Sequence, residues 1–258
     1  MKRFITFAVI AALAISVLGC PTAGYGAETL KAATTTALKA KAVSDQAITL
    51  TWKKAEQASG YEVYKYHAKK KKYGKIAIVK KNSFKCTGLE ADTTYRFKVR
   101  AYISKGGKTY YGAFSKVVKE KTEKSQGQKV VAKAKKKIGA SYRAGAAGPK
   151  AFDCSGFVYW VYKNAGVKPK KKVKRTSSAG LYHSLKKHKV GSSIKSIKKA
   201  KAGDIILFTR GRSFSHAAIY AGKGKLIHAS TPKRGVVSTS VKTLHNSGTK
   251  VAAIIRVV

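Results

Sequence analysis

The sequence predicts a multidomain protein in which an all-β sandwich is followed by an α+β domain. From Ala47 to Ala101, apolar residues alternate with polar ones in short runs, a pattern typical of half-buried strands. After residue 128, two stretches that read as helices precede three short apolar segments of strand length. We therefore place the sandwich at 30–124 and the α+β domain at 128–258.

The strands of the first domain are read from the apolar positions that alternate along it. Turns containing Gly, Lys or Asp separate these runs, which favours a β-sandwich built from short strands. The lysine run at 69–72 is expected at the tip of a hairpin. The positions expected to face inward are Ile48, Leu50, Trp52, Tyr61, Val63, Ile76, Ile78, Phe84, Cys86, Leu89, Tyr95, Phe97, Val99 and Ala101.

Two stretches of this domain resemble fibronectin type III domains. "ITLTWKKAEQASGYEVYKY" is similar to their second and third strands, and "LEADTTYRFKVRAY" to the segment with the buried corner tyrosine, here Tyr95. The resemblance implies a spacer or a binding module, and we find no catalytic constellation in this half. The polar stretch "TEKSQGQ", at 122–128, is expected to be the linker.

The N-terminus has the pattern of an export signal. Lys2 and Arg3 precede an apolar run at 4–18, and small residues follow it. This run is shorter than the roughly 20 apolar residues of a membrane-spanning helix. We expect a signal peptide over 1–27 and a secreted protein. "VLGC" resembles a lipoprotein cleavage box, which would lipidate Cys20 and give the only membrane attachment; the alternative is ordinary cleavage in "TAGYGAE".

The charge of the chain excludes some chemistry. The 55 lysines and arginines outnumber the 10 acidic residues, giving a formal net charge of +45. From Val131 onward, Asp153 and Asp204 are the only carboxylates. Glycosidases of the common type need two carboxylates at one bond, so that chemistry is not expected here. Nucleic-acid binding is not expected either, because the lysines are scattered and no recognised nucleic-acid motif is present.

The stretch "AFDCSGFVYWVYKNAG", at 151–166, is a candidate for a nucleophile-bearing helix. It follows an expected helix in "KVVAKAKKKIGA" that ends at Gly139. Asp153 is a good N-cap residue, which places Cys154 in the first helical turn. There the unpaired backbone N–H groups and the positive end of the helix dipole favour a thiolate. The other cysteine beyond the leader, Cys86, is expected to be a buried hydrophobic residue, and a Cys86–Cys154 disulfide is not expected.

Three expected strands follow, in "AGDIILF", "SHAAIY" and "KLIHAS", and they carry His216 and His228. A thiolate nucleophile needs a base to take its proton, and that base needs an orienting partner. Cys154 and these two histidines supply all three roles. The remaining histidines lie in polar or lysine-rich stretches and are expected at the surface: His67, His183, His188 and His245.

The second half resembles the NlpC-type cell-wall cysteine endopeptidases, which are papain-like. The resemblance lies in "YRAGAAGPKAFDCSGFVYWVYKNAG", "RTSSAG", "AGDIILF", "SHAAIYAG" and "LIHAS", in that order. It implies a helix carrying the nucleophile, packed on an antiparallel sheet carrying the histidines. By this resemblance Cys154 is the nucleophile, His216 the base and His228 the third polar residue.

The same resemblance implies a function and a substrate. It implies a secreted or lipid-anchored peptidoglycan hydrolase that cleaves the γ-D-glutamyl bond to the diamino acid of stem peptides. Tyr142 would line the site, and Asp153 and Ser155 would help to bind the amino end of the substrate. No cofactor or metal is expected, because the sequence has no CxxC pair and no HExxH motif. The lysine excess would draw the protein to anionic wall polymers such as teichoic acid, or would only keep it soluble.

Two other readings stay open, and the sequence departs from the family pattern in places. The domain could be an amidase or acyltransferase on the same fold, or a non-catalytic protein that binds the cell envelope. Ala202 stands where the family commonly has proline, and Ala179 and Gly180 where it often has glutamine. The loop "VKPKKKVKR" is unusually rich in lysine. These departures leave the fine specificity open, including the choice between diaminopimelate and lysine.

Overall fold

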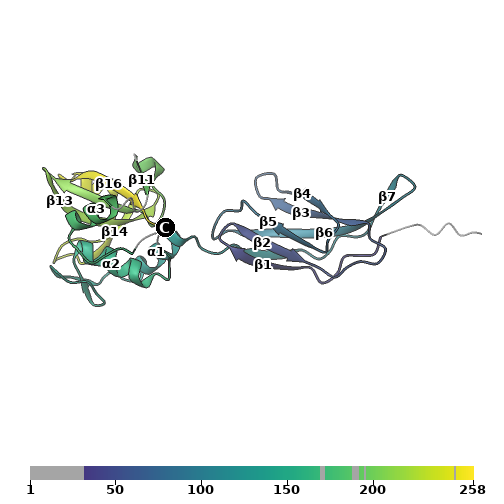
Figure 1. The fold of residues 1–258 in the computed structure, drawn as a ribbon, viewed down its shortest axis with the longest axis horizontal. Helices are drawn as coiled ribbons and strands as arrows, with labels where there is room; N and C mark the ends of the chain where they lie inside the picture. Colours follow the sequence, from purple (N-terminus) through teal and green to yellow (C-terminus); the bar gives the residue numbers. More distant parts are fainter. Residues whose placement is uncertain (1–31, 169–171, 188–191, 195, 247) are drawn as a thin grey trace, which may run out of the picture.

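The computed structural model describes residues 32–168, 172–187, 192–194, 196–246 and 248–258. Figure 1 shows two lobes joined by one segment of chain, the first made of strands and the second of helices and strands. The expected signal peptide and Cys20 lie outside the described residues. Among the residues that are described, no helix has the length and apolar character needed to cross a lipid bilayer.

The first lobe is a sandwich of two antiparallel sheets, as predicted. One sheet has the order β1-β2-β5, and the other has the order β4-β3-β6-β7, with β8 also paired to β6. Alternate residues of both sheets point into one core around Trp52, Tyr61 and Phe97. The strands are β1 (Lys39–Ser44), β2 (Ala47–Thr51), β3 (Gly60–His67), β4 (Lys72–Val79), β5 (Ser83–Cys86), β6 (Thr94–Lys105), β7 (Lys108–Tyr111) and β8 (Val118–Lys121).

Two expectations for this lobe need correction. The hydroxyl of Tyr95 accepts a hydrogen bond from the Glu90 amide at 2.8 Å, as a corner tyrosine should, but its side chain is half-buried rather than buried. Ile78 is 57% exposed, although it was expected to face inward with Ile76. Between β3 and β4, Val63 pairs with Ala77 and Tyr64 with Lys75, so Ile76 is the extra residue of a β-bulge. The bulge breaks the alternation of inward and outward side chains along β4. Ile78 consequently pairs with Glu62, whose buried carboxylate forms an ion pair.

The boundary between the lobes is shorter than the expected linker. β8 ends at Lys121, and α1 (Gln126–Lys135) already begins within the expected linker. Ser125 caps this helix: its hydroxyl accepts a hydrogen bond from the Gln128 amide at 3.2 Å, and the Gln128 side chain accepts one from the Ser125 amide at 2.9 Å. Because of this capping box, the helix begins earlier than its apolar pattern indicates. At its other end, the helix stops at Lys135 rather than at Gly139.

The second lobe is an α+β domain, as predicted, built on one antiparallel sheet of six strands. The strand order is β11-β16-β12-β13-β14-β15. α1 and α2 pack against β13 and β14, and α3 packs against β13. The other elements are β9 (Ser141–Tyr142), β10 (Ala151–Phe152), α2 (Cys154–Asn164), α3 (Ser178–Lys187), β11 (Ser192–Ser193), η1 (Ile197–Lys199), β12 (Ile205–Arg210), β13 (Ser213–Gly222), β14 (Lys225–Ala229), β15 (Val236–Ser240), α4 (Val241–Asn246) and β16 (Lys250–Arg256).

Both faces of this sheet are covered, which explains the unbroken apolar run in β12. Ile205 and Leu207 belong to the core beneath α1, α2 and α3. Ile206 and Phe208 belong to a second core, against which residues of η1 and α4 pack. All four side chains are fully buried. The sheet is therefore a rigid platform, and the side chains near its edge and ends are the ones that can reach a substrate.

Asp204 has a structural role at the start of β12. Its carboxylate is buried and forms an ion pair with Arg256 of β16 at 2.8 Å. It also accepts a hydrogen bond from the Lys201 amide at 2.8 Å. Because this carboxylate is fully engaged in tying β12 to β16, it does not form a catalytic pair with Asp153.

Candidate active site

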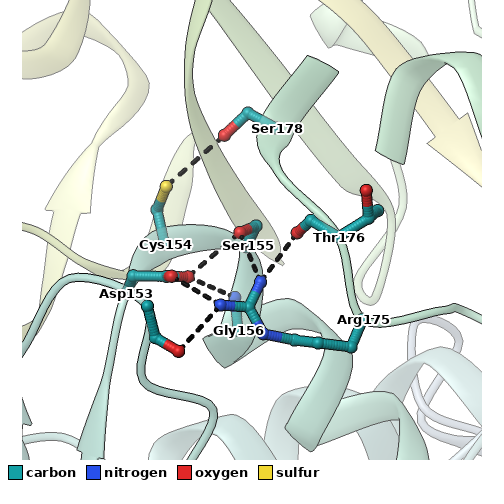
Figure 2. Close-up of polar contacts among 8 residues, drawn as sticks. Asp153, Cys154, Ser155, Gly156, Arg175, Thr176 and Ser178 are labelled. Carbon is teal, nitrogen blue, oxygen red and sulfur yellow. Dashed lines mark hydrogen bonds and ion pairs between the residues drawn. The ribbon is translucent and has the colours of Figure 1, made fainter. Parts of the chain in front are cut away.

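The N-terminus of α2 presents the thiol of Cys154. Asp153 is the N-cap, as expected, and its carboxylate accepts a hydrogen bond from the Gly156 amide at 2.6 Å. Gly156 is required there because a Cβ at this position would collide with the carbonyl oxygen of Ala146. The sulfur of Cys154 points toward Ser178 at the start of α3, and Sγ lies 3.4 Å from the hydroxyl oxygen (Figure 2).

Cys154 opens into a hollow of about 340 Å³. The three residues predicted to contact substrate, Tyr142, Asp153 and Ser155, all line it with the thiol. The pKa of Tyr142 is raised, first by burial and then by the repulsion between a phenolate and the ionised forms of Cys154 and Asp153. The remaining lining residues are Ala144, Gly145, Arg175, Ser177, Ser178 and Phe214.

Arg175 joins three segments around the thiol (Figure 2). Its Nη2 forms an ion pair with Asp153 at 2.7 Å and donates to the carbonyl oxygen of Gly145 at 3.0 Å. Its Nη1 donates to the Ser155 hydroxyl at 3.2 Å and to the carbonyl oxygen of Thr176 at 2.8 Å. We name this arrangement the Arg175 clasp, because it ties the first turn of α2 to two neighbouring loop segments.

The Arg175 clasp was not expected from the sequence, although a signal for it exists. Asp153 is one of only two carboxylates in the second half, so a cation close to it could have been sought in the motif "RTSSAG". The clasp engages Asp153 and Ser155, the two residues expected to bind the amino end of the substrate. Their role toward an amine stays a prediction, and an incoming amine would have to share Asp153 with Arg175.

The two predicted histidines form a pair on neighbouring strands. The Nε2 atom of His216, on β13, lies 2.7 Å from Nδ1 of His228, on β14. The Nε2 atom of His228 lies 2.8 Å from the hydroxyl oxygen of Thr239, on β15. Thr239 was not anticipated, because a threonine in "VVSTS" belongs to no recognisable motif. We name this series of hydrogen-bonded side chains the histidine chain. Because its contact with His228 occupies Nε2 of His216, Nδ1 is the nitrogen of that ring that can accept a proton from a thiol.

Burial keeps both imidazoles neutral. It lowers the pKa of His216 to about 4, because a charged ring would lose its hydration. Burial also lowers the pKa of His228 to about 3, helped by the repulsion that a protonated His216 and Arg234 would exert on a charged ring. A neutral imidazole at pH 7 can accept a proton, which is the state that a general base requires.

The first residues of β13 line both the hollow of the nucleophile and the hollow of the histidine pair. Phe214 lines the hollow of Cys154, whereas Ser215 and His216 line a second hollow. A bulge at this point pairs His216 with Phe208 and Phe214 with Thr209, and Ser215 is the extra residue. The described contacts include no hydrogen bond between the Cys154 sulfur and either imidazole. The contact of nucleophile and base therefore stays a prediction, and catalytic hydrogen bonds are often long without substrate.

The other described cysteine and histidines are not among the residues that line either hollow. Cys86 is buried in the first lobe, where burial raises the pKa of its thiol, and no disulfide joins it to Cys154. His183 and His245 are exposed, as expected, and His67 is half-buried. His188 lies outside the described residues.

Comparison with known proteins assigns both domains. Residues 139–254 match the model of the NlpC/P60 family, and residues 33–117 match the model of the fibronectin type III domain. The chain thus carries an NlpC/P60 domain preceded by a fibronectin type III domain, in agreement with both resemblances found in the sequence.

The similar curated proteins are named as endopeptidases. A probable endopeptidase of Corynebacterium glutamicum is 40% identical over 111 residues, which are 42% of this chain and 46% of that protein. The probable endopeptidase p60 of Listeria monocytogenes is 35% identical over 100 residues, covering 39% of this chain and 18% of that protein. The probable peptidoglycan endopeptidase LytE of Bacillus subtilis is 35% identical over 120 residues, covering 46% and 30%. The matched region is less than half the length of each of these relatives.

The chain is also similar to solved structures. The NlpC/p60 domain of the peptidoglycan hydrolase SagA is 29% identical, with a TM-score of 0.40, and the match covers 50% of this chain and 97% of that one.

Proposed function

We propose that the NlpC/P60 domain of this chain is a cysteine endopeptidase that cuts peptidoglycan stem peptides between γ-D-glutamate and the diamino acid. The observation that carries the proposal is the thiol of Cys154 in the first turn of α2, open to a hollow that Phe214 of β13 also lines. The same strand carries His216, which pairs with His228 on β14, and both imidazoles are neutral. The names of the relatives, LytE above all, support peptidoglycan as the substrate.

In the proposed reaction, Nδ1 of His216 takes the proton of the Cys154 thiol. The thiolate then attacks the γ-carbonyl carbon of the D-glutamyl residue, and the C–N bond to the diamino acid breaks as the imidazolium returns its proton to the leaving amine. Water, deprotonated by the same imidazole, hydrolyses the thioester and frees the thiol. The first-turn N–H groups of α2 support the thiolate, since they carry the positive end of the helix dipole.

One choice of tautomers for His216 and His228 allows His216 to act as the general base. If Nε2–H of His228 donates to Thr239, then Nδ1 of His228 accepts from Nε2–H of His216, and Nδ1 of His216 holds a lone pair. His228 then orients the base without touching the thiol. A change at His228 should therefore cost less activity than a change at His216.

The site of action is proposed from the composition and from the relatives. We infer that the leader directs the protein to the cell wall, that the fibronectin type III domain spaces the enzyme from its attachment, and that the lysine excess binds anionic wall polymers. The alternative enzymatic reading, an amidase or acyltransferase, keeps Cys154 but changes the bond cut or the acceptor.

The test is product analysis on a defined mixture of muropeptides. We expect fragments ending in γ-D-glutamate from the unaltered protein, and none from Cys154→Ala, because the thioester cannot form without the sulfur. The matched control is Cys86→Ala, which removes the other described thiol and should leave the products unchanged. Fragments cut at the N-acetylmuramoyl–L-alanine bond would instead support an amidase, and hydrolysis by Cys154→Ala would refute the proposed nucleophile.

A further inference from the structure

A second hollow, of about 380 Å³, lies next to the histidine pair. We name it the arginine hollow, because Arg210 and Arg234 stand in its wall with five hydroxyl side chains, and no carboxylate is among its described lining residues. Such a wall offers hydrogen-bond donors and positive charge, which suit an anion with several oxygens. The five hydroxyl groups belong to Ser215, Ser230, Thr231, Thr243 and Thr249.

The position of the arginine hollow relates it to one half of the substrate. The amine that leaves must collect its proton from His216, so the leaving half of the peptide has to lie beside this imidazole. His216 is in the wall of the arginine hollow, whereas Cys154, which holds the acyl half, is in the wall of the other hollow. The linings of the two hollows come next to each other on β13, where Phe214 belongs to one and Ser215 to the other. The arginine hollow is thus the place for the diamino acid.

Arg234 is the cation best placed to bind this half. It precedes β15, and its positive charge is felt at the imidazole of His228, where it helps burial to lower the pKa. No ion pair or side-chain hydrogen bond of Arg234 is found in the described part of the chain, and the residue is exposed. A guanidinium in this state can pair with a carboxylate through two parallel hydrogen bonds.

The candidate diamino acids differ in the group that Arg234 would meet. Diaminopimelate carries a carboxylate on the carbon that bears its distal amine, whereas lysine carries only hydrogen there. We propose that the arginine hollow binds this distal carboxylate through Arg234, and that the enzyme therefore selects diaminopimelate over lysine on the leaving side of the bond. This inference rests on the proposed function for the identity of the substrate.

The experiment measures binding without hydrolysis, so that it does not depend on the reaction. The full chain with Cys154→Ala is titrated calorimetrically with three stem peptides that differ at one residue: diaminopimelate, diaminopimelate with its distal carboxylate amidated, and lysine. We expect the free carboxylate to bind about 10- to 100-fold more tightly than the other two, the range of a hydrogen bond to a charged group. The amidated peptide is nearly isosteric, so it isolates the charge.

Variants at Arg234 assign the effect to the hollow. Adding Arg234→Gln to the Cys154→Ala chain should reduce binding of the diaminopimelate peptide to the level of the lysine peptide and leave the lysine peptide unchanged. Arg234→Lys should keep part of the preference, and Lys233→Gln, at the exposed neighbouring residue, should keep all of it. Equal affinity for the three peptides, or an equal loss for all of them in Arg234→Gln, would overturn the inference.

The two proposals can fail separately. If the unaltered chain cuts no stem peptide but the Cys154→Ala chain prefers the free carboxylate through Arg234, the hollow is supported and the endopeptidase is not. If the unaltered chain cuts diaminopimelate and lysine peptides equally well and binding shows no preference, the endopeptidase stands and the inference falls.

Discussion

At the scale of single residues, Arg175 does more at this site than its sequence context indicates. It donates four hydrogen bonds, and these hold Asp153, Ser155 and two loop carbonyl groups around the thiol. The side chains of Arg175 and Asp153 are 31% and 13% exposed, so the ion pair is only partly screened by water. Arg175 therefore acts as a positioning residue for the nucleophile.

We expect Arg175→Gln to lower both stability and activity. The free energy of unfolding should fall by about 1–3 kcal/mol, because the change leaves a partly buried carboxylate without its cation. The value of kcat/KM should fall with it, since the first turn of α2 loses its ties to the loops. Urea denaturation and hydrolysis of a stem peptide measure the two effects. Lys174→Gln, at the exposed neighbour, is the control, and an Arg175→Gln protein equal to it in both assays would contradict the role.

Some residues of the site could be predicted from the sequence and others could not. Cys154, His216 and His228 follow from motifs in which each residue type has a chemical reason to stand where it does. Arg175, Ser178 and Thr239 do not, because their roles arise when segments far apart in the chain pack together. Their side chains are common at surfaces. The motif "RTSSAG" contains Arg175 and Ser178, but it does not show which distant residues they contact once the chain is folded.

At the scale of elements, the histidine chain connects three neighbouring strands. His216, His228 and Thr239 lie on β13, β14 and β15, so the pair contributes to the sheet as well as to the chemistry. Burial holds the pKa of His216 at about 4 and that of His228 at about 3, below the ordinary value of about 6.5 in an unfolded chain. Between these pH values the unfolded chain binds protons that the folded chain does not.

We therefore expect stability to fall as the pH drops from about 6.5 to about 4, because proton uptake favours the unfolded state. The loss should amount to a few kcal/mol, at about 1.4 kcal/mol for each unit of pKa difference. Urea denaturation at pH 7, 5.5 and 4 measures it. His228→Asn should lessen the dependence on pH, and His183→Asn, at an exposed histidine, should not. An identical dependence in His228→Asn would show that other groups cause it.

Element boundaries were predicted less well than element types. The apolar pattern gave α2 and the strands that carry His216 and His228, since burial on fixed faces leaves a strong period. It missed the start of α1, which a capping box determines, and the orientation of Ile78, which a bulge reverses. Caps and bulges depend on one or two hydrogen bonds, and hydrophobic periodicity does not report these.

At the scale of the whole molecule, the division into two domains could be predicted because each half has its own hydrophobic periodicity and its own motifs.

The excess of positive charge is also a property of the whole chain. Ten carboxylates cannot pair with 55 basic residues, so most of the lysines have no carboxylate partner within the chain. Six ion pairs are found among the described residues, and three of them use arginine. The unpaired charge is available to an external polyanion.

This charge should anchor the protein to anionic walls in a salt-dependent way. Electrostatic attraction is screened over about 8 Å at physiological ionic strength and over shorter distances as salt increases. The Cys154→Ala chain, which leaves the wall intact, should sediment with purified walls at low salt and be released at high salt. Walls stripped of teichoic acid are the matched control and should retain much less protein at low salt. Retention that is the same at both salt concentrations, or on both kinds of wall, would mean that the lysines serve solubility and that attachment comes from elsewhere, such as the fibronectin type III domain.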